Sequence, residues 1–388
     1  MRSFFGLFGL IFGICVLYLV VWPVPVQPKA WQAPPNPGYS GDFAPNARLT
    51  DLEFLDLDGR TGPEDVAVGP DGLIYVATHG GEIIRRGTNP KDVAEVFAIT
   101  GGRPLGLEFA PDGTLYVADA FKGLLSIDQN GEVNVLATEA DGSPILYAND
   151  LDIAQDGTIY FTDASTRFGA EANGGTLSAS ILDLIEHSNN GRVLKYDPVT
   201  GKASLFANGM TFPNGVAIGP DGAIFVVETG AYRVWRLSPD GAERKVVLEN
   251  LPGFPDNIND APDGTMWLGL VSPRNDLMDK LDQSPAIRRA VLRLPQKMKP
   301  APTRYGFILR MRGDGKVVET LQDPKGAYAL TTGAVTGPDG KIYVASLTER
   351  RLGVLDHSGC SGVLKAEIVA NGLKVSPAAS EMPNAVPC

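Results

Sequence analysis

Cysteine and histidine are scarce in this sequence of 388 residues, which contains three of each. No two cysteines have the C-x-x-C spacing of a structural zinc site, so that kind of metal centre is excluded. Cys15 lies in an apolar segment near the N-terminus, which leaves Cys360 and Cys388 as the only pair for a disulfide. The alternative is that both remain free thiols.

Positively charged residues are also few, because the sequence has 34 Lys and Arg but 45 Asp and Glu, which gives a net charge of −11. We therefore expect no nucleic-acid partner, since binding phosphates requires a basic face. The G-x-S-x-G motif of common serine hydrolases is missing as well. The composition suits an acidic protein that gathers carboxylates around a cation.

The N-terminal segment from Phe4 to Trp22 contains no charged residue and follows Arg2. A helix needs about 20 apolar residues to cross a bilayer, so the segment predicts a signal-anchor transmembrane helix over residues 1–22. The N-terminus would be cytoplasmic and the rest of the protein extracytoplasmic (periplasmic, extracellular or lumenal). A cleaved signal peptide is the alternative. Seven prolines in residues 23–47 predict an extended stalk, and the folded body spans residues 48–388.

One short pattern occurs six times along the body: an apolar run, an Asp-Gly turn and a second apolar run with an aromatic residue. An example is VAVGPDGLIYVAT. Asp-Gly between alternating apolar runs is a strong β-hairpin signal, because glycine adopts positive φ at no steric cost. The six turn aspartates are Asp71, Asp112, Asp156, Asp221, Asp263 and Asp339.

The spacing of these turns indicates how the hairpins assemble. Intervals of 41, 44 and 42 residues match a four-stranded propeller blade, which is about 40–50 residues long. The two longer intervals hold insertions at about residues 165–190 and 272–305, which we expect to be helical. The sequence therefore predicts an all-β protein, a six-bladed β-propeller with two helical insertions and an N-terminal transmembrane helix.

In a propeller the first strand of each blade lines the central channel, so equivalent positions of the six hairpins converge on one axis. Seven residues before the turn aspartate, four blades carry a carboxylate or an amide: Glu64, Asn149, Asn214 and Asp256. These are oxygen ligands of the kind that Ca²⁺ takes in proteins. The pattern predicts calcium at the axis. The alternative is that these residues only cap the starts of their strands.

Other side chains at this end of the channel are candidates for chemistry. Acidic residues end the second strand of three hairpins, and all three are candidates to shuttle protons or orient ligands: Asp119, Asp163 and Glu228. His79 is the only histidine near this rim and is a candidate general base. Ordinary solvated loop and strand-end roles are the alternative for these four residues.

Five longer motifs stand out in the sequence: GPEDVAV, YANDLDIAQDGTIYFTDAST, GRVLKYDPVTG, FPNGVAIGPDGAIFVVET and LPGFPDNIND. Together they resemble the strictosidine synthase-like family, within the calcium-dependent propellers that include gluconolactonases and paraoxonases. The resemblance covers about residues 48–356. It implies that the four axial residues hold a catalytic calcium with Asn257 as an additional ligand. It also implies that Asp65 and Asp150 hold a second, structural calcium.

Two departures from the family pattern bear on the activity. Gly333 stands where strictosidine synthase uses a glutamate, so strictosidine synthase activity is not expected, and the paraoxonase histidine pair has no counterpart. The resemblance then implies a membrane-anchored, calcium-dependent esterase or lactonase whose metal polarises the carbonyl of a small hydrophobic ester or lactone. The alternative is a non-catalytic, calcium-stabilised propeller that serves as a membrane-tethered binding module.

The insertion at 272–305 bears on the partners of the protein. It holds eight Lys and Arg against three Asp, and four apolar residues share one face of the predicted helix: Ile287, Ala290, Val291 and Leu294. Such a helix either lies on anionic lipid or packs as a lid over the channel mouth. The lid is favoured, because the insertion leaves its blade at the end where the axial ligands lie.

Overall fold

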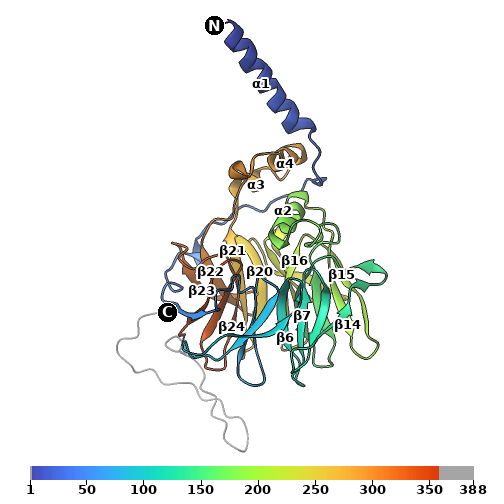
Figure 1. Ribbon diagram of the computed structural model, residues 1–388, viewed down its shortest axis with the longest axis vertical. Helices are drawn as coiled ribbons and strands as arrows, with labels where there is room; N and C mark the ends of the chain where they lie inside the picture. Colours follow the sequence, from blue (N-terminus) through green and yellow to red (C-terminus); the bar gives the residue numbers. More distant parts are fainter. Residues whose placement is uncertain (1, 358–388) are drawn as a thin grey trace, which may run out of the picture.

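The structure is a computed structural model that describes residues 2–357. Six four-stranded antiparallel sheets surround a central axis, and the α-helices gather at one end of the ring (Figure 1). The prediction of a six-bladed β-propeller with few helices is therefore confirmed. Cys360 and Cys388, the predicted disulfide pair, lie outside the described residues.

The first three blades are built from consecutive strands. Blade 1 contains β2 (Val66–Val68), β3 (Ile74–Ala77), β4 (Glu82–Arg86) and β5 (Glu95–Ile99). Blade 2 contains β6 (Pro104–Phe109), β7 (Leu115–Asp119), β8 (Gly123–Ile127) and β9 (Val133–Ala137). Blade 3 contains β12 (Ala148–Ile153), β13 (Ile159–Asp163), β14 (Gly191–Asp197) and β15 (Lys202–Met210), and a small hairpin of β10 (Glu139–Ala140) and β11 (Ser143–Pro144) precedes it.

The remaining blades complete the ring. Blade 4 contains β16 (Pro213–Ile218), β17 (Ile224–Glu228), β18 (Arg233–Leu237) and β19 (Arg244–Leu248). Blade 5 contains β20 (Gly253–Asp260), β21 (Met266–Pro273), β22 (Gly306–Met311) and β23 (Val317–Asp323). Blade 6 contains β24 (Thr331–Thr336), β25 (Ile342–Ser346) and β26 (Arg351–Leu355), and its fourth strand is β1 (Glu53–Asp56) from the N-terminal side.

The six predicted Asp-Gly turns are present, with a side-chain bond from the aspartate to the backbone and a glycine after it. The Oδ1 atom of Asp71 accepts the Leu73 N–H at 3.0 Å, and the equivalent bond recurs in the other five hairpins. Gly72, which follows the aspartate, has a φ of 75°, in the left-handed region that favours glycine. These turns fix the register of the inner strand of each blade.

The helices lie at the end of the propeller from which the inner strands start. α2 (Thr176–Glu186) follows β13, while α3 (Asp276–Lys280) and α4 (Pro285–Leu292) follow β21, so both predicted insertions are helical. α1 (Arg2–Val21) precedes the propeller, and the short 3₁₀ turns are η1 (Gly41–Phe43), η2 (Thr229–Ala231) and η3 (Gln296–Met298).

The prediction of a membrane location is overturned. Among residues 2–357, no helix is both long enough and apolar enough to cross a membrane, a crossing that takes about 20 predominantly apolar residues. α1 forms over the segment predicted as a signal-anchor. The predicted single-pass topology with an extracytoplasmic propeller is therefore wrong.

Candidate metal centre

The predicted ligands lie where the pairing of the inner strands is irregular. The register shifts at residues 148–151 in blade 3, 213–216 in blade 4 and 255–258 in blade 5. A β-bulge of this kind re-aims side chains that would otherwise alternate between the two faces of a sheet. Two consecutive residues of one strand, such as Asn149 and Asp150, are therefore both buried at the channel.

The five residues predicted at the first metal site converge from four blades. All are buried, with exposed fractions between 0 and 6%: Glu64, Asn149, Asn214, Asp256 and Asn257. The Asn257 side-chain amide donates to the backbone oxygen of Glu64 at 3.2 Å, and the Asn214 amide bonds the carboxylate of Asp256. The structure thus brings together two carboxylates and three amides at one end of the channel.

The two carboxylates of this ring destabilise one another as anions. Burial raises the pKa of Glu64 to about 7, an effect that Arg103 opposes and Asp65 adds to. Burial and then the charge of Glu64 raise the pKa of Asp256 well above its ordinary range. A cation between them would favour both ionised forms.

Three amide oxygens in the same ring have no hydrogen-bond donor. The Oδ1 atoms of Asn149, Asn214 and Asn257 are buried and without a partner among the described residues. Each such group costs about 1–3 kcal/mol in desolvation unless something satisfies it. Within residues 2–357, no group of three or more His, Cys, Asp and Glu could hold a metal, so amides would have to complete the donor set. Two carboxylates with orphan amide oxygens fit a hard cation such as Ca²⁺.

The next position of each inner strand alternates between a polar side chain and glycine around the ring. In blade order the residues are Asp65, Gly106, Asp150, Gly215, Asn257 and Gly333. A Cβ added at Gly106 would lie 2.5 Å from Asp150 Oδ1, and one at Gly215 would lie 2.8 Å from the Asn257 Cα. Six side chains do not fit at this level of the axis, and the glycines leave room for the three that are present.

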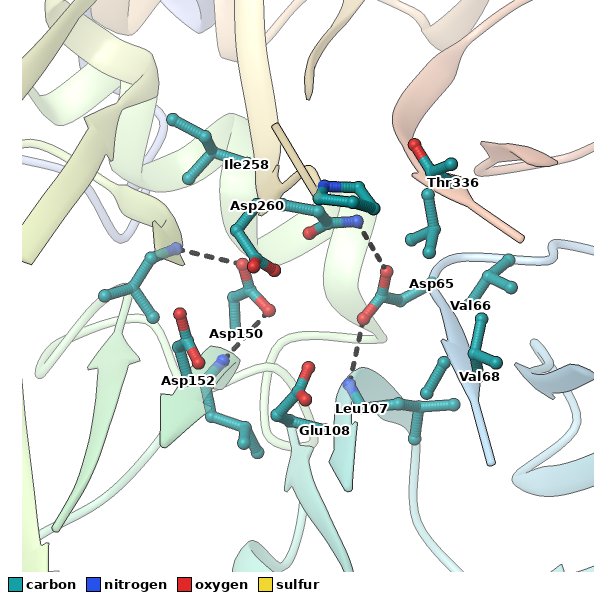
Figure 2. A pocket seen from close by; sticks show the side chains of 16 residues that line it. Asp65, Val66, Val68, Leu107, Glu108, Asp150, Asp152, Ile258, Asp260 and Thr336 are labelled. Atoms are coloured by element: carbon teal, nitrogen blue, oxygen red, sulfur yellow. Dashed lines mark hydrogen bonds between the residues drawn. The ribbon is translucent and has the colours of Figure 1, made fainter. Parts of the chain in front are cut away.

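Asp65 and Asp150, the predicted second metal site, face a deeper cavity of about 220 Å³ (Figure 2). Each carboxylate accepts a backbone N–H from the inner strand of the following blade, at Leu107 and Val216 respectively, both at 2.9 Å. They therefore connect blade 1 to blade 2 and blade 3 to blade 4.

Three more carboxylates line the same cavity: Glu108, Asp152 and Asp260. Burial and the charge of Asp65 raise the pKa of Asp150, and burial raises that of Asp65 to about 6. Burial and then the charge of Asp152 raise the pKa of Glu108 well above its ordinary range. The cavity therefore has a strongly negative potential when these groups ionise.

Asp163 and Glu228, proposed above as proton carriers, are fully engaged in holding the start of their own blade. Asp163 accepts the Tyr147 N–H at 2.9 Å and forms an ion pair with Arg192 at 2.9 Å. Glu228 accepts the Thr211 N–H at 2.8 Å and bonds Arg233 and Trp235 through its other oxygen. Asp119 accepts the Arg103 N–H in the same way in blade 2. This geometry favours a structural role for these strand-end acids.

His79 lies at the rim, directly after Thr78 and β3. Partial burial and the nearby charge of Arg103 lower its pKa, so the imidazole is neutral at neutral pH. A neutral imidazole has a nitrogen that can accept a proton.

Arg103 is the residue at this site that the sequence reasoning missed. Nine residues before each turn aspartate stand Gly62, Arg103, Tyr147, Phe212, Phe254 and Leu330, so one cation interrupts an otherwise uncharged column. The guanidinium is 3% exposed and lies 3.3 Å from a carboxylate oxygen of Glu64. A comparison of this column across the six hairpins would have found it.

An apolar layer covers the candidate metal centre. Leu105, Tyr147 and Phe212, which stand at the start of the inner strands, form one buried cluster with Val26 and with residues of α2 such as Ala179. Val26 belongs to residues 22–36, which we call the N-terminal strap. α2, which contributes Ala179 to this layer, lies at the end of the propeller where the helices gather (Figure 1).

Hydrogen bonds to backbone oxygens hold the strap against the insertions. Arg288 of α4 is 1% exposed and donates to the carbonyl oxygens of Lys29, Asp282 and Ile185, which joins strap, α4 and α2. Ile287, on the face of this helix that the sequence suggested was apolar, is instead exposed.

Comparison with known proteins places the chain in a family. Residues 41–86 match the family described as strictosidine synthase-like, N-terminal, and residues 149–237 match strictosidine synthase. The chain is 32% identical to the adipocyte plasma membrane-associated protein of Salmo salar, with 86% of this chain and 85% of that protein covered. It is 35% identical to the protein strictosidine synthase-like 10 of Arabidopsis thaliana, with 84% and 91% covered.

Solved structures with the same fold share less sequence. A gluconolactonase from Xanthomonas campestris matches with a TM-score of 0.57 at 16% identity, covering 85% of this chain and 96% of that chain. The calcium-binding protein regucalcin from Agrobacterium tumefaciens matches with a TM-score of 0.54 at 16% identity, covering 78% and 93%. These structures support the propeller fold, while the relatives identify the family. The chain belongs to the strictosidine synthase-like family.

Proposed function

We propose that the protein is a calcium-dependent hydrolase of esters or lactones that acts at the ring of Glu64, Asn149, Asn214 and Asp256, with Asn257 beside them. The observation that carries this proposal is the set of three buried amide oxygens without donors, next to two buried carboxylates. The gluconolactonase of the same fold supports a hydrolytic use of the propeller. Gly333 in place of a glutamate argues against strictosidine synthase activity.

Each group of residues at this site has a separate role in the proposed hydrolysis. Glu64 and Asp256 would supply two negative charges and the amides would supply neutral dipoles to hold the cation. Calcium bound there would act as a Lewis acid toward the substrate carbonyl. Leu105, Tyr147 and Phe212 exclude bulk water from the reacting group, which strengthens electrostatic interactions with it. His79, neutral at neutral pH, is the candidate to take a proton from the attacking water.

The test is a hydrolysis assay of phenyl acetate and a panel of lactones, with calcium and after chelation. We expect activity that disappears on chelation and returns with calcium. Asp256→Asn keeps the shape of the side chain but removes a charge, so it should lower activity at limiting calcium. Glu53→Gln, an exposed acid on β1, is the matched control and should leave activity unchanged. Hydrolysis that is indifferent to calcium would contradict the proposal.

One observation favours a second candidate, a calcium-stabilised binding module without catalysis. Val26 is 2% exposed and packs in the layer above the ring, so a substrate reaches the ring only if that layer moves. A melting temperature that responds to calcium, together with no hydrolysis of any ester or lactone, would support this candidate instead.

A further inference from the structure

Arg103 carries a buried positive charge that is poorly satisfied. Its side chain is 3% exposed, yet its two contacts are long: 3.3 Å from Nη2 to Glu64 and 3.5 Å from Nη1 to the Pro104 carbonyl. Ordinary N–H···O bonds are about 2.9 Å long. The Nε atom is buried with no acceptor among the described residues. A guanidinium has five N–H donors, so most of its capacity is unused.

The backbone fixes this side chain in place. Asp119 Oδ1 accepts the Arg103 N–H at 2.9 Å and also accepts the N–H of Phe121, which anchors the segment that enters β6. The side chain is thereby held toward the ring, where Glu64 is its ion-pair partner. Its position results from the packing of blade 2 and not from a flexible surface loop.

Orphan acceptors and an orphan donor therefore occur in one buried place. Within the described part of the chain, the amide oxygens of Asn149, Asn214 and Asn257 lack a donor and could bind a cation. Arg103 Nε lacks an acceptor there and could donate to an oxygen atom. A carboxylate satisfies both requirements, because one oxygen can face the cation while the guanidinium binds the carboxylate through parallel N–H bonds. Glu64 and Asp256 nearby disfavour a more highly charged anion such as phosphate.

The surroundings indicate what the carboxylate is attached to. Leu105, two residues after Arg103, packs with Tyr147 and Phe212 in a layer of apolar side chains. This layer suits an alkyl or aryl group. We infer that Arg103 binds the carboxylate of an apolar monocarboxylic acid, the acid half that ester or lactone hydrolysis at the neighbouring ring would release. The inference rests on the proposed function for the source of the acid, but the binding itself requires no catalysis.

Calorimetric titration of benzoate into the full-length, calcium-loaded protein tests this inference. Arg103→Met removes the donors at similar side-chain length and should weaken benzoate binding by about tenfold or more, since hydrogen bonds to charged groups contribute about 1.5–3 kcal/mol. Arg103→Lys keeps the charge opposite Glu64, which protects the fold, but lacks the forked donors, and should give an intermediate affinity. Arg86→Met, at a buried arginine of β4 that bonds the backbone oxygens of Asp56 in β1 and of Asp92, should bind benzoate like the wild type.

Two results would overturn the inference. If the wild type does not bind benzoate, Arg103 is not an anion site, whatever the hydrolysis assay gives. If benzoate binds equally to all variants while Arg103→Met, which removes the positive charge, binds calcium more tightly, the arginine is only the counter-ion of Glu64. Benzoate binding without any ester or lactone hydrolysis would support the inference and contradict the proposed hydrolase. Inorganic phosphate, titrated in parallel, should bind more weakly than benzoate.

Discussion

At the scale of single residues, glycine matters as much as the ligands. The alternation of polar residues and glycine around the axis allows Asp65, Asp150 and Asn257 to occupy one level of the channel. The restriction is steric, because neighbouring inner strands approach within contact distance there.

Gly106→Ala tests this packing. Its Cβ would lie 2.5 Å from Asp150 Oδ1 and 2.7 Å from the Asp150 Cα, so backbone as well as side chain has to shift. Overpacking of this kind costs typically about 1–3 kcal/mol. Urea unfolding should show a loss of stability in that range. Gly80→Ala, where the nearest atom within reach is 3.8 Å away, is the control and should change little. Equal effects of the two substitutions would show that space at the axis is not limiting.

At the scale of elements, the strap and the helical insertions form one unit over the channel. The Trp31 ring stacks on His187 at the end of α2, with 3.8 Å between ring centroids, and the Trp31 N–H donates to the Asp282 carbonyl. Lys29 donates its N–H to the carbonyl oxygen of Glu186 at 2.8 Å. These contacts connect segments that are more than a hundred residues apart in the sequence.

His187 makes this unit sensitive to acid. Burial, followed by the charges of Arg288 and Arg233, lowers its pKa to about 3 from an ordinary value of 6.5. The unfolded chain therefore binds a proton below pH 6.5 that the folded protein does not bind. Stability is fully present above pH 6.5 and is lost as the pH falls toward 3. Between pH 7.5 and pH 5 the loss from this group is about 2 kcal/mol.

Urea unfolding of the wild type and of His187→Gln at the two pH values measures this contribution. The variant should lose less stability on acidification, because glutamine does not titrate. An identical change in the two proteins would contradict the assignment. The buried carboxylates contribute equally to the pH dependence of stability in both proteins, so their contribution cancels in the comparison.

The sequence predicted the parts of this structure that rest on local chemistry. Asp-Gly turns specify hairpins through the φ preference of glycine and the carboxylate bond to the backbone, so six blades and the axial column of Glu64, Asn149, Asn214 and Asp256 could be aligned. The bulges that aim Asn149 and Asp150 inward together depend on pairing between strands, which no single segment encodes. The contact of Arg103 with Glu64 joins two blades, and the packing of the strap joins distant segments, so both were missed.

At the scale of the whole molecule, the ring is closed by pairing of the first strand in the sequence, β1, with β26 of blade 6. β1 pairs with β26, with Leu55 opposite Leu352, and Leu55 packs in a cluster shared by blades 6 and 1. This pairing covers the edge of β26 that would otherwise be unpaired. It also holds Glu64 in register with ligands from blades 3, 4 and 5.

Leu55→Ala measures the contribution of this closure. The side chain is 1% exposed, and truncating a buried leucine costs about 2–5 kcal/mol. Thermal or urea unfolding should show this loss. The exposed neighbour Glu53→Ala should have little effect. If the two variants were equally stable, β1 would not be essential for the closed ring.

Binding at the axis requires the closed ring, because the ligands come from four blades. The most direct test of the account is the melting temperature of the full-length protein as a function of free calcium. We predict a rise equivalent to about 2.7 kcal/mol when free calcium is a hundred times its dissociation constant. Asp256→Ala should lose most of this response, and Leu105→Ala, in the same column without a ligand, should keep it. Wild-type melting that is the same in calcium and in chelator would contradict the account.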